Sequence, residues 1–219
     1  MDGVLLELPH ERAWREALTE IGDPTLFTHQ IYLDFVVGQT LEEGARAILT
    51  RINAAEPIRL ARFYVARKQA RLDRLLQDGV IRVFPDAFGF ADRVSSAGLP
   101  LAATAASPHF DILLRAVLSD GGRPVASLFQ AAVSRTDLSR AELCRLAAQG
   151  LDVDPDHCLV VEADKAGVTA ACALGALVLG VARFGHPERL VSAGADTVVE
   201  TLDGVDIDCL IQGQRRVRP

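Results

Sequence analysis

Apolar positions in the first part of the chain recur three and four residues apart, the spacing that places them on one face of an α-helix. This pattern predicts helices in segments 10–22, 28–38, 40–54 and 58–79. Thr28 is placed to cap the second helix, and Thr40 with Glu43 three residues later has the spacing of a capping box. We therefore expect a small bundle of about four helices over residues 8–80.

Beyond Phe84 the pattern changes to short continuous apolar runs that alternate with helical segments. Continuous apolar runs are typical of strands that are buried on both faces, and their alternation with helices predicts parallel βαβ units. The expected strands are 99–105, 127–133, 157–163, 176–182 and 197–201, and the expected helices are 87–98, 110–120, 139–150 and 165–175. The fold class is therefore α/β, and a ligand is expected at the carboxyl ends of the strands.

Composition and charge narrow the classes of partner. The net charge of −6 gives no overall basic field for nucleic acid, and no apolar run is long enough to span a membrane. The amino-terminal residues lack the pattern of a secretory signal, so a cytoplasmic location is expected. The four cysteines have neither zinc-site nor redox-motif spacing, and they are interpreted as small buried residues in a reducing compartment.

Four segments carry a family resemblance: "DGVL" (2–5), "HERAW" (10–14), "GLPLAATAASPH" (98–109) and "VDPDHCLVVEADKAGVTAACALGA" (153–176). Together they resemble the haloacid dehalogenase superfamily, most closely its phosphatases and β-phosphoglucomutases with an inserted helical cap. The resemblance implies a Rossmann-like three-layer core with a parallel sheet, formed by residues 1–7 and 81–219. Residues 8–80 would form the α-helical cap.

In that family one aspartate attacks phosphorus, and a second aspartate two residues later acts as general acid and base. A Mg²⁺ ion, a Ser or Thr hydroxyl and a lysine balance the charge of the phosphoryl group. Asp2 matches the second aspartate, so the nucleophile position would precede Met1. The resemblance thus implies an acid–base residue at Asp2 but assigns no nucleophile in this sequence.

Two phosphate-binding positions depart from the family pattern. Ala105 stands where Ser or Thr is usual, and the neighbouring Thr104 either supplies the hydroxyl through a bulge or is a buried strand residue. Leu138 stands at the lysine position. Arg135 or Arg140 would be the replacement cation, although a guanidinium has different reach and geometry and Arg140 also fits a solvated position at a helix start.

The metal-binding motif departs as well. Glu162 is kept, but Ala163 occupies the position of the usual aspartate, and Asp164 follows one residue later. Glu162 and Asp164 are either the remaining ligands of a Mg²⁺ site or carboxylates that cap the helix beginning near Lys165.

The cap also carries one family position. His10 matches the family histidine near the cap hinge, and the alternative for it is a helix-start or surface residue.

These departures leave three hypotheses. The first is a protein of this fold with lost or strongly impaired phosphoryl transfer, acting as a binding, regulatory or structural protein. Its partner would be a small phosphorylated ligand, a second copy or another protein. The second is an active Mg²⁺-dependent phosphatase or sugar phosphomutase whose first strand and nucleophilic aspartate lie upstream of a mis-assigned start. The third is different chemistry from the acidic cluster of Asp2, Glu162 and Asp164.

Overall fold

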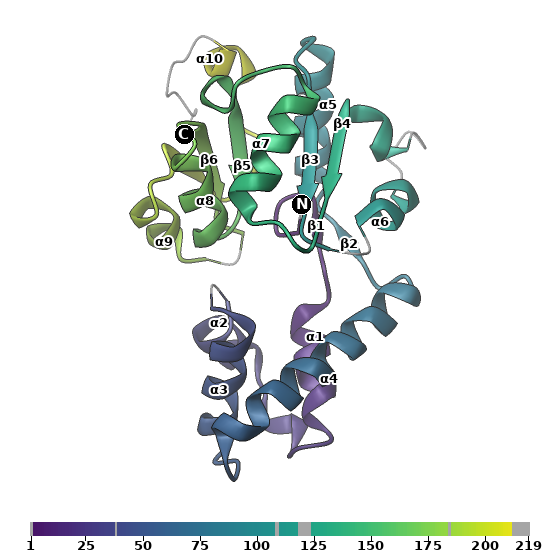
Figure 1. Ribbon diagram of the computed structural model, residues 1–219, viewed down its shortest axis with the longest axis vertical. Helices are drawn as coiled ribbons and strands as arrows, with labels where there is room; N and C mark the ends of the chain where they lie inside the picture. Colours follow the sequence, from purple (N-terminus) through teal and green to yellow (C-terminus); the bar gives the residue numbers. More distant parts are fainter. Residues whose placement is uncertain (1, 38, 108–109, 118–123, 184, 212–219) are drawn as a thin grey trace. The chain divides into compact units, whose positions relative to one another are not determined.

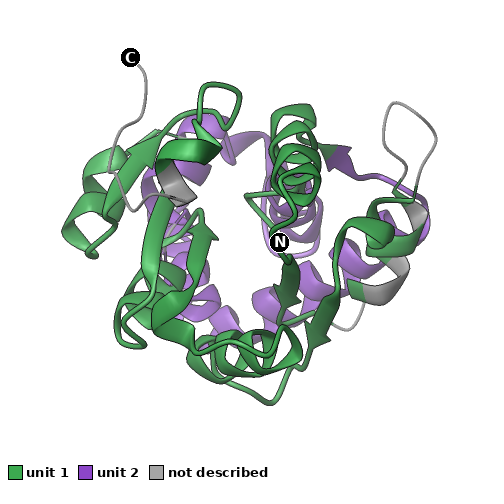
Figure 2. Ribbon diagram, turned by 90° about the horizontal axis from the view of Figure 1, so that it is seen from above, with its two compact units in different colours: residues 1–7, 83–219 green, residues 8–82 purple. Residues whose placement is uncertain are grey.

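The computed structural model describes residues 2–37, 39–107, 110–117, 124–183 and 185–211. The chain divides into two compact units, which Figure 2 shows in different colours. We call residues 1–7 with 83–219 the core unit and residues 8–82 the cap unit. Each unit has its own hydrophobic interior.

The cap unit is helical. Its helices are α1 (His10–Leu18), α2 (His29–Phe35), α3 (Leu41–Arg51) and α4 (Pro57–Gln77) (Figure 1). Thr28 Oγ1 accepts a hydrogen bond from the Ile31 amide at the start of α2. Thr40 and Glu43 form the complete capping box at the start of α3. The expected helices and both of these helix starts are confirmed.

Aromatic residues organise the interior of the cap unit. Trp14 and Tyr64 are fully buried, and their rings meet edge to face with centroids 4.9 Å apart. The Tyr64 hydroxyl donates a hydrogen bond of 2.8 Å to the Trp14 carbonyl oxygen, which ties α4 to α1. Burial raises the pKa of Tyr64, so this hydroxyl remains a donor well into the alkaline range.

The core unit has the expected α/β character, with parallel strands and covering helices. β3 (Ala102–Ala105) pairs with β4 (Ala131–Ser134), and β5 (Leu159–Glu162), β6 (Leu177–Val181) and β7 (Thr197–Val199) form a second parallel sheet in that order. β1 (Leu6–Glu7) and β2 (Arg82–Val83) form a separate two-stranded sheet. The helices are α5 (Pro85–Ser96), α6 (Phe110–Ala116), α7 (Arg140–Gly150), α8 (Lys165–Cys172), α9 (Pro187–Ser192) and α10 (Ile207–Ile211).

The structure corrects several local predictions. The segment 127–133 is not one strand, because Val125–Leu128 forms a 3-10 turn and β4 begins only at Ala131. Strands β1 and β2 and helices α9 and α10 were not predicted. The four cysteines form no disulfide and are partly exposed rather than buried. Residues 118–120 of the expected helix 110–120 lie outside the described residues.

The opening segment of the core unit packs as a tight loop. Val4, Leu5 and Leu6 are buried, and the Gly3 amide donates to the Leu6 carbonyl oxygen at 2.7 Å. Gly3 has a φ of +75°, and a Cβ there would lie 2.9 Å from the Ala163 Cβ just beyond β5. A residue without a side chain is therefore needed where this loop passes the end of the strand.

A buried ion pair joins distant parts of the core unit. Arg183 Nη1 lies 2.8 Å from Asp86 Oδ2, and the two side chains are only 8% and 10% exposed. The guanidinium also donates to the Val4 carbonyl oxygen and stacks over the Phe84 ring with its Cζ 4.1 Å from the centroid. Asp86 accepts a second bond from the Leu202 amide. The pair thus links the opening loop, the start of α5 and the segments after β6 and β7.

Candidate functional site at the carboxyl ends of β3, β4 and β5

The ends of β3 and β4 place small side chains beside each other. Ala105, the last residue of β3, pairs in register with Ser134, the last residue of β4. The Ser134 hydroxyl donates to the Ser107 carbonyl oxygen at 2.7 Å and so holds the loop that follows β3. Thr104 is half-buried one position earlier in β3. The described end of β3 therefore carries a methyl group at the position where the resemblance expects a hydroxyl.

The end of β5 carries two carboxylates around Ala163. Glu162 is the last residue of β5, and Asp164 is the N-cap of α8. The Gly167 amide donates to Asp164 Oδ1 at 2.9 Å, which confirms a capping role for Asp164. Glu162 Oε2 accepts from the Ala163 amide at 3.3 Å, and its side chain is 13% exposed. Both carboxylates are therefore held by backbone amides at the start of α8.

Arg140 brings a cation to these carboxylates. It is the first residue of α7, and its Nη2 lies 2.6 Å from Asp164 Oδ2 while its Nη1 lies 3.7 Å from Glu162 Oε1. Of the two arginines considered at the lysine position, Arg135 instead makes a bidentate, exposed pair with Asp137. The structure thus brings together Arg140, Glu162 and Asp164.

Burial governs the charge state of Glu162. Removal from water raises the pKa of its carboxyl group, and the nearby negative charge of Asp164 raises it further. The positive charge of Arg140 acts in the opposite direction without outweighing burial. Glu162 consequently takes up a proton more readily than a glutamate in water does.

Asp2 belongs to the exposed side of the opening loop and forms an isolated bridge with Leu6. Because Gly3 lies against Ala163, the loop that carries Asp2 adjoins the end of β5. Nothing in the described contacts assigns a chemical role to Asp2, so its part in acid–base chemistry stays a prediction.

His10 lies in the cap unit, where the structure reveals a partner that the sequence analysis missed. Lys68 Nζ lies 2.9 Å from His10 Nδ1, donates to Gln69 Oε1 at 2.9 Å and sits 5.6 Å from the centroid of the Trp14 ring. Lys68 is the one fully buried charged side chain among the described residues. Its signal in the sequence was its rarity, since the chain has only two lysines.

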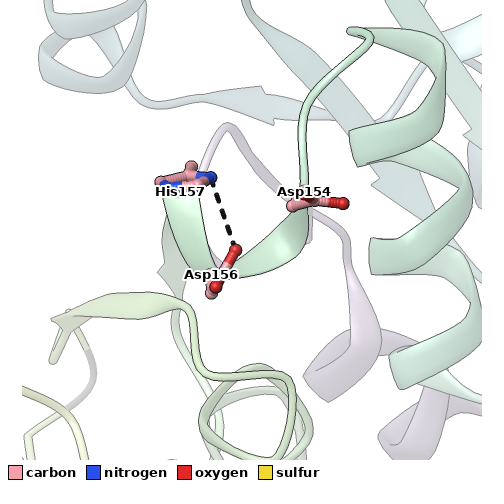
Figure 3. A group of neighbouring side chains, drawn as sticks. All are labelled: Asp154, Asp156 and His157. Atoms are coloured by element: carbon pink, nitrogen blue, oxygen red, sulfur yellow. Dashed lines mark ion pairs between the residues drawn. The ribbon is translucent and has the colours of Figure 1, made fainter.

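One further group of potential metal ligands occurs in the described part of the chain. Asp154, Asp156 and His157 lie in the turn before β5, with His157 Nδ1 3.5 Å from Asp156 Oδ1 (Figure 3). All three side chains are exposed, which is the ordinary setting of solvated surface acids. The group does not include Glu162 or Asp164, and we assign no ion to it.

Replacing Gly167 with alanine should move Glu162 at little cost in stability. A Cβ at Gly167 would lie 2.2 Å from the Glu162 Cδ, so the carboxylate must turn away. The carboxylate ends a flexible side chain, and alanine is favoured over glycine in a helix by about 0.8–1.0 kcal/mol. The raised pKa of Glu162, followed by carboxyl NMR through a pH titration, should fall towards its ordinary value; an unchanged titration would contradict this geometry.

Gly150→Ala is the matched control for that variant. Its Cβ would lie 2.8 Å from the Ala131 Cβ, a strand methyl group that cannot rotate away. The overlap between α7 and β4 should destabilise the core unit by about 1–3 kcal/mol in urea unfolding. The titration of Glu162 should stay as in the unmodified protein.

Comparison with solved structures identifies the superfamily to which this fold belongs. The β-phosphoglucomutase of Pyrococcus sp. strain ST 04 superposes with a TM-score of 0.81 at 25% identity, covering 96% of this chain and 94% of that one. The chain belongs to the haloacid dehalogenase superfamily. Its α/β core of parallel strands with a helical cap is the predicted β-phosphoglucomutase-like fold of that superfamily.

Two further relatives extend the comparison. A haloacid dehalogenase family hydrolase of Deinococcus radiodurans, solved with bound phosphate and sodium, shares the fold with a TM-score of 0.69 at 19% identity over 100% of this chain and 95% of its own. The trehalose-phosphate phosphatase of Mycobacterium tuberculosis is 49% identical over 63 residues. That match covers 28% of this chain and only 16% of the relative. No protein-family model matches the chain.

The superfamily resemblance of the sequence is therefore confirmed, while its site residues stay predictions. Among the described helices none is both long and apolar enough to cross a membrane.

Proposed function

We propose that this haloacid dehalogenase-like protein has lost or strongly reduced phosphoryl transfer and acts as a binding, regulatory or structural protein. The observation that carries the proposal is the ion pairing of Arg140 with Glu162 and Asp164 at the end of β5. Ala163, between the two carboxylates, and Ala105, at the end of β3, offer no side-chain oxygen. The positive charge of Arg140 therefore balances negative charge of the two carboxylates within the cluster. The site lacks groups that phosphoryl transfer requires.

The Mg²⁺ ion that the resemblance implies does not fit these residues as they stand. Mg²⁺ requires six oxygen ligands in near-ideal octahedral geometry, usually including one or two carboxylates. Here one Asp164 oxygen accepts from the Gly167 amide, and the other is 2.6 Å from Arg140 Nη2. A guanidinium at that distance opposes the approach of a divalent cation by charge and by volume. We therefore derive no catalytic step through a metal.

The expected loss of rate is large. Removing one group that stabilises the charge of a transition state typically costs about 10²–10³ in rate. Three such positions differ here: Ala105 for the hydroxyl, Leu138 for the lysine and Ala163 for the aspartate. Although such effects do not add, several together leave little of the reaction.

The partner classes follow from the fold. A small phosphorylated molecule is the proposed ligand class, supported by the phosphate bound to the Deinococcus relative and by the phosphatase and phosphomutase names of the others. A second copy or another protein chain is the alternative partner. The four partly exposed cysteines form no disulfide, and the proposal places the protein in the cytoplasm, where thiols stay reduced.

The second candidate function is an active Mg²⁺-dependent phosphatase or sugar phosphomutase. Its support is the 25% identity to the Pyrococcus β-phosphoglucomutase along nearly the whole chain and the local 49% identity to a phosphatase. It requires a strand and a nucleophilic aspartate from outside this sequence. It leaves Ala105, Leu138 and Ala163 without explanation.

Hydrolysis assays separate the two candidates. The chain, purified together with any in-frame upstream extension that its gene encodes, should hydrolyse p-nitrophenyl phosphate and sugar phosphates no faster than buffer, and added Mg²⁺ should not change the rate. The Asp2→Asn variant should be indistinguishable from the unmodified chain. Mg²⁺-stimulated turnover that disappears in Asp2→Asn would establish the second candidate instead.

A further inference from the structure

The start of α7 fixes the backbone of Arg140, whose side chain is 47% exposed. Ser139 and Glu142 form a capping box, in which Glu142 Oε2 accepts from the Ser139 amide at 2.8 Å and Ser139 Oγ accepts from the Glu142 amide at 3.3 Å. This box fixes the first turn of the helix, and Arg140 is its first residue. The guanidinium therefore approaches the end of β5 from a rigid element.

The two carboxylates are fixed from the opposite side. Asp164 is held through Oδ1 by the Gly167 amide, and Glu162 is held through Oε2 by the Ala163 amide. The remaining oxygens, Asp164 Oδ2 and Glu162 Oε1, are the atoms that Arg140 approaches. Each carboxylate thus directs one oxygen to the backbone and one to the guanidinium.

When both carboxyl groups are ionised, their two like charges, one of them largely out of water, are stabilised by a positive charge nearby. A guanidinium spreads its charge over a planar fork of donors, so two of its nitrogens reach two acceptors at once. We propose that Arg140 is the resident cation of this site: it takes the charge-balancing place of a divalent ion and excludes such an ion. This inference rests on the proposed loss of metal-dependent chemistry, and it names what replaced the metal.

The inference predicts a gain of metal binding on removal of the guanidinium. In Arg140→Gln the two carboxylate oxygens lose their cation, and a hard divalent ion is the available substitute. Mn²⁺ is the probe, because the electron paramagnetic resonance signal of the free ion is lost on binding. Arg140→Gln should bind Mn²⁺ about 10-fold or more tightly than the unmodified protein, since a repelling charge has been removed.

Three controls make the result specific. The double variant Arg140→Gln/Glu162→Gln should lose the gained site, because one of its carboxylates is gone. Arg140→Lys keeps the positive charge and should gain little. All variants are also compared in an Asp156→Asn background, because the exposed group of Asp154, Asp156 and His157 is a second place for Mn²⁺.

Thermal melting provides an independent readout of Mn²⁺ binding. It remains informative if Arg140→Gln is less stable than the unmodified protein. Mn²⁺ should raise the melting temperature of Arg140→Gln but neither that of the unmodified protein nor that of the double variant. The inference is overturned if the unmodified protein binds Mn²⁺ as tightly as Arg140→Gln through Glu162, or if Arg140→Gln gains nothing. Turnover by a protein that binds no Mn²⁺ through Glu162 would contradict the proposed function alone.

Discussion

Replacing Asp86 with alanine should lower the free energy of unfolding of the core unit by about 3–5 kcal/mol, the usual cost of leaving one charge of a buried ion pair without its partner. The Arg183 side chain, only 8% exposed in the intact pair, would keep only the Val4 carbonyl oxygen as a described acceptor. Its Nε has no hydrogen-bond partner among the described residues even with Asp86 present. The Leu202 amide would also lose its acceptor.

Amide hydrogen exchange followed by mass spectrometry suits this test, because it reports the two units separately. Peptides from β6, α5 and β7 should lose protection in Asp86→Ala, and those from the cap unit should not. The matched control is Asp137→Ala, which breaks the exposed pair with Arg135 and should change little. Equal losses of protection in the two variants would show that burial of the Arg183–Asp86 pair does not contribute to the stability of the core unit.

The same pair has a pH signature. Burial alone would raise the pKa of Asp86, but the hydrogen bonds from Arg183 and from the Leu202 amide outweigh it and hold the pKa below its ordinary value of 3.8. A carboxyl group with a lowered pKa in the folded state stabilises the fold above its unfolded pKa and loses that contribution as the pH falls through the folded value. The stability difference between the unmodified protein and Asp86→Ala should therefore be constant at neutral pH and shrink below pH 3.8.

Replacing Trp14 with alanine should destabilise the cap unit by about 3–5 kcal/mol. The indole is fully buried, meets the Tyr64 ring edge to face and lies beside the Lys68 ammonium group. Its removal leaves a cavity where α1 contacts α4. The buried ammonium group of Lys68 also loses its contact with the indole ring.

Hydrogen exchange in α1 and α4 measures this loss, and Phe63→Ala is the matched control. Phe63 neighbours Tyr64 in α4 but is 47% exposed, so its truncation should cost no more than about 0.5 kcal/mol. The loss of stability in Tyr64→Phe should lie between those of the other two variants, at about 1–3 kcal/mol. This variant leaves the ring in place and removes only the hydrogen bond to the Trp14 carbonyl oxygen. Similar losses of stability in Trp14→Ala and Phe63→Ala would contradict the claim that Trp14 is a central part of the cap interior.

Local signals explain why most elements could be predicted. The side chains of Thr28, Thr40 and Ser139 begin helices by accepting hydrogen bonds from the amides three residues later, so the information lies within one turn. The strand at 131–134 shows the limit of such signals. Its start is set by Gln130, whose amide donates to the Leu101 carbonyl oxygen and whose side chain accepts from the Leu101 amide. That pairing partner is remote in sequence, so the apolar run alone could not locate it.

The sequence predicted the residues of the candidate site but not the contacts among them. Glu162, Asp164 and Arg140 were each named from the family pattern, whereas the ion pairing among them depends on how α7 and β5 meet in space. The Arg183–Asp86 pair and the contact of Lys68 with His10 were missed for the same reason. In each case the partners lie on different elements, and a periodic pattern reports only which face of one element is buried.

The central claim is that a guanidinium, and not a divalent ion, balances Glu162 and Asp164. A crystal structure determined from Mn²⁺-soaked crystals, with anomalous diffraction data to locate the ion, tests it most directly. The account predicts Arg140 in contact with both carboxylates and no anomalous peak within bonding distance of Glu162. A Mn²⁺ peak coordinated by Glu162, with Arg140 turned away, would contradict it.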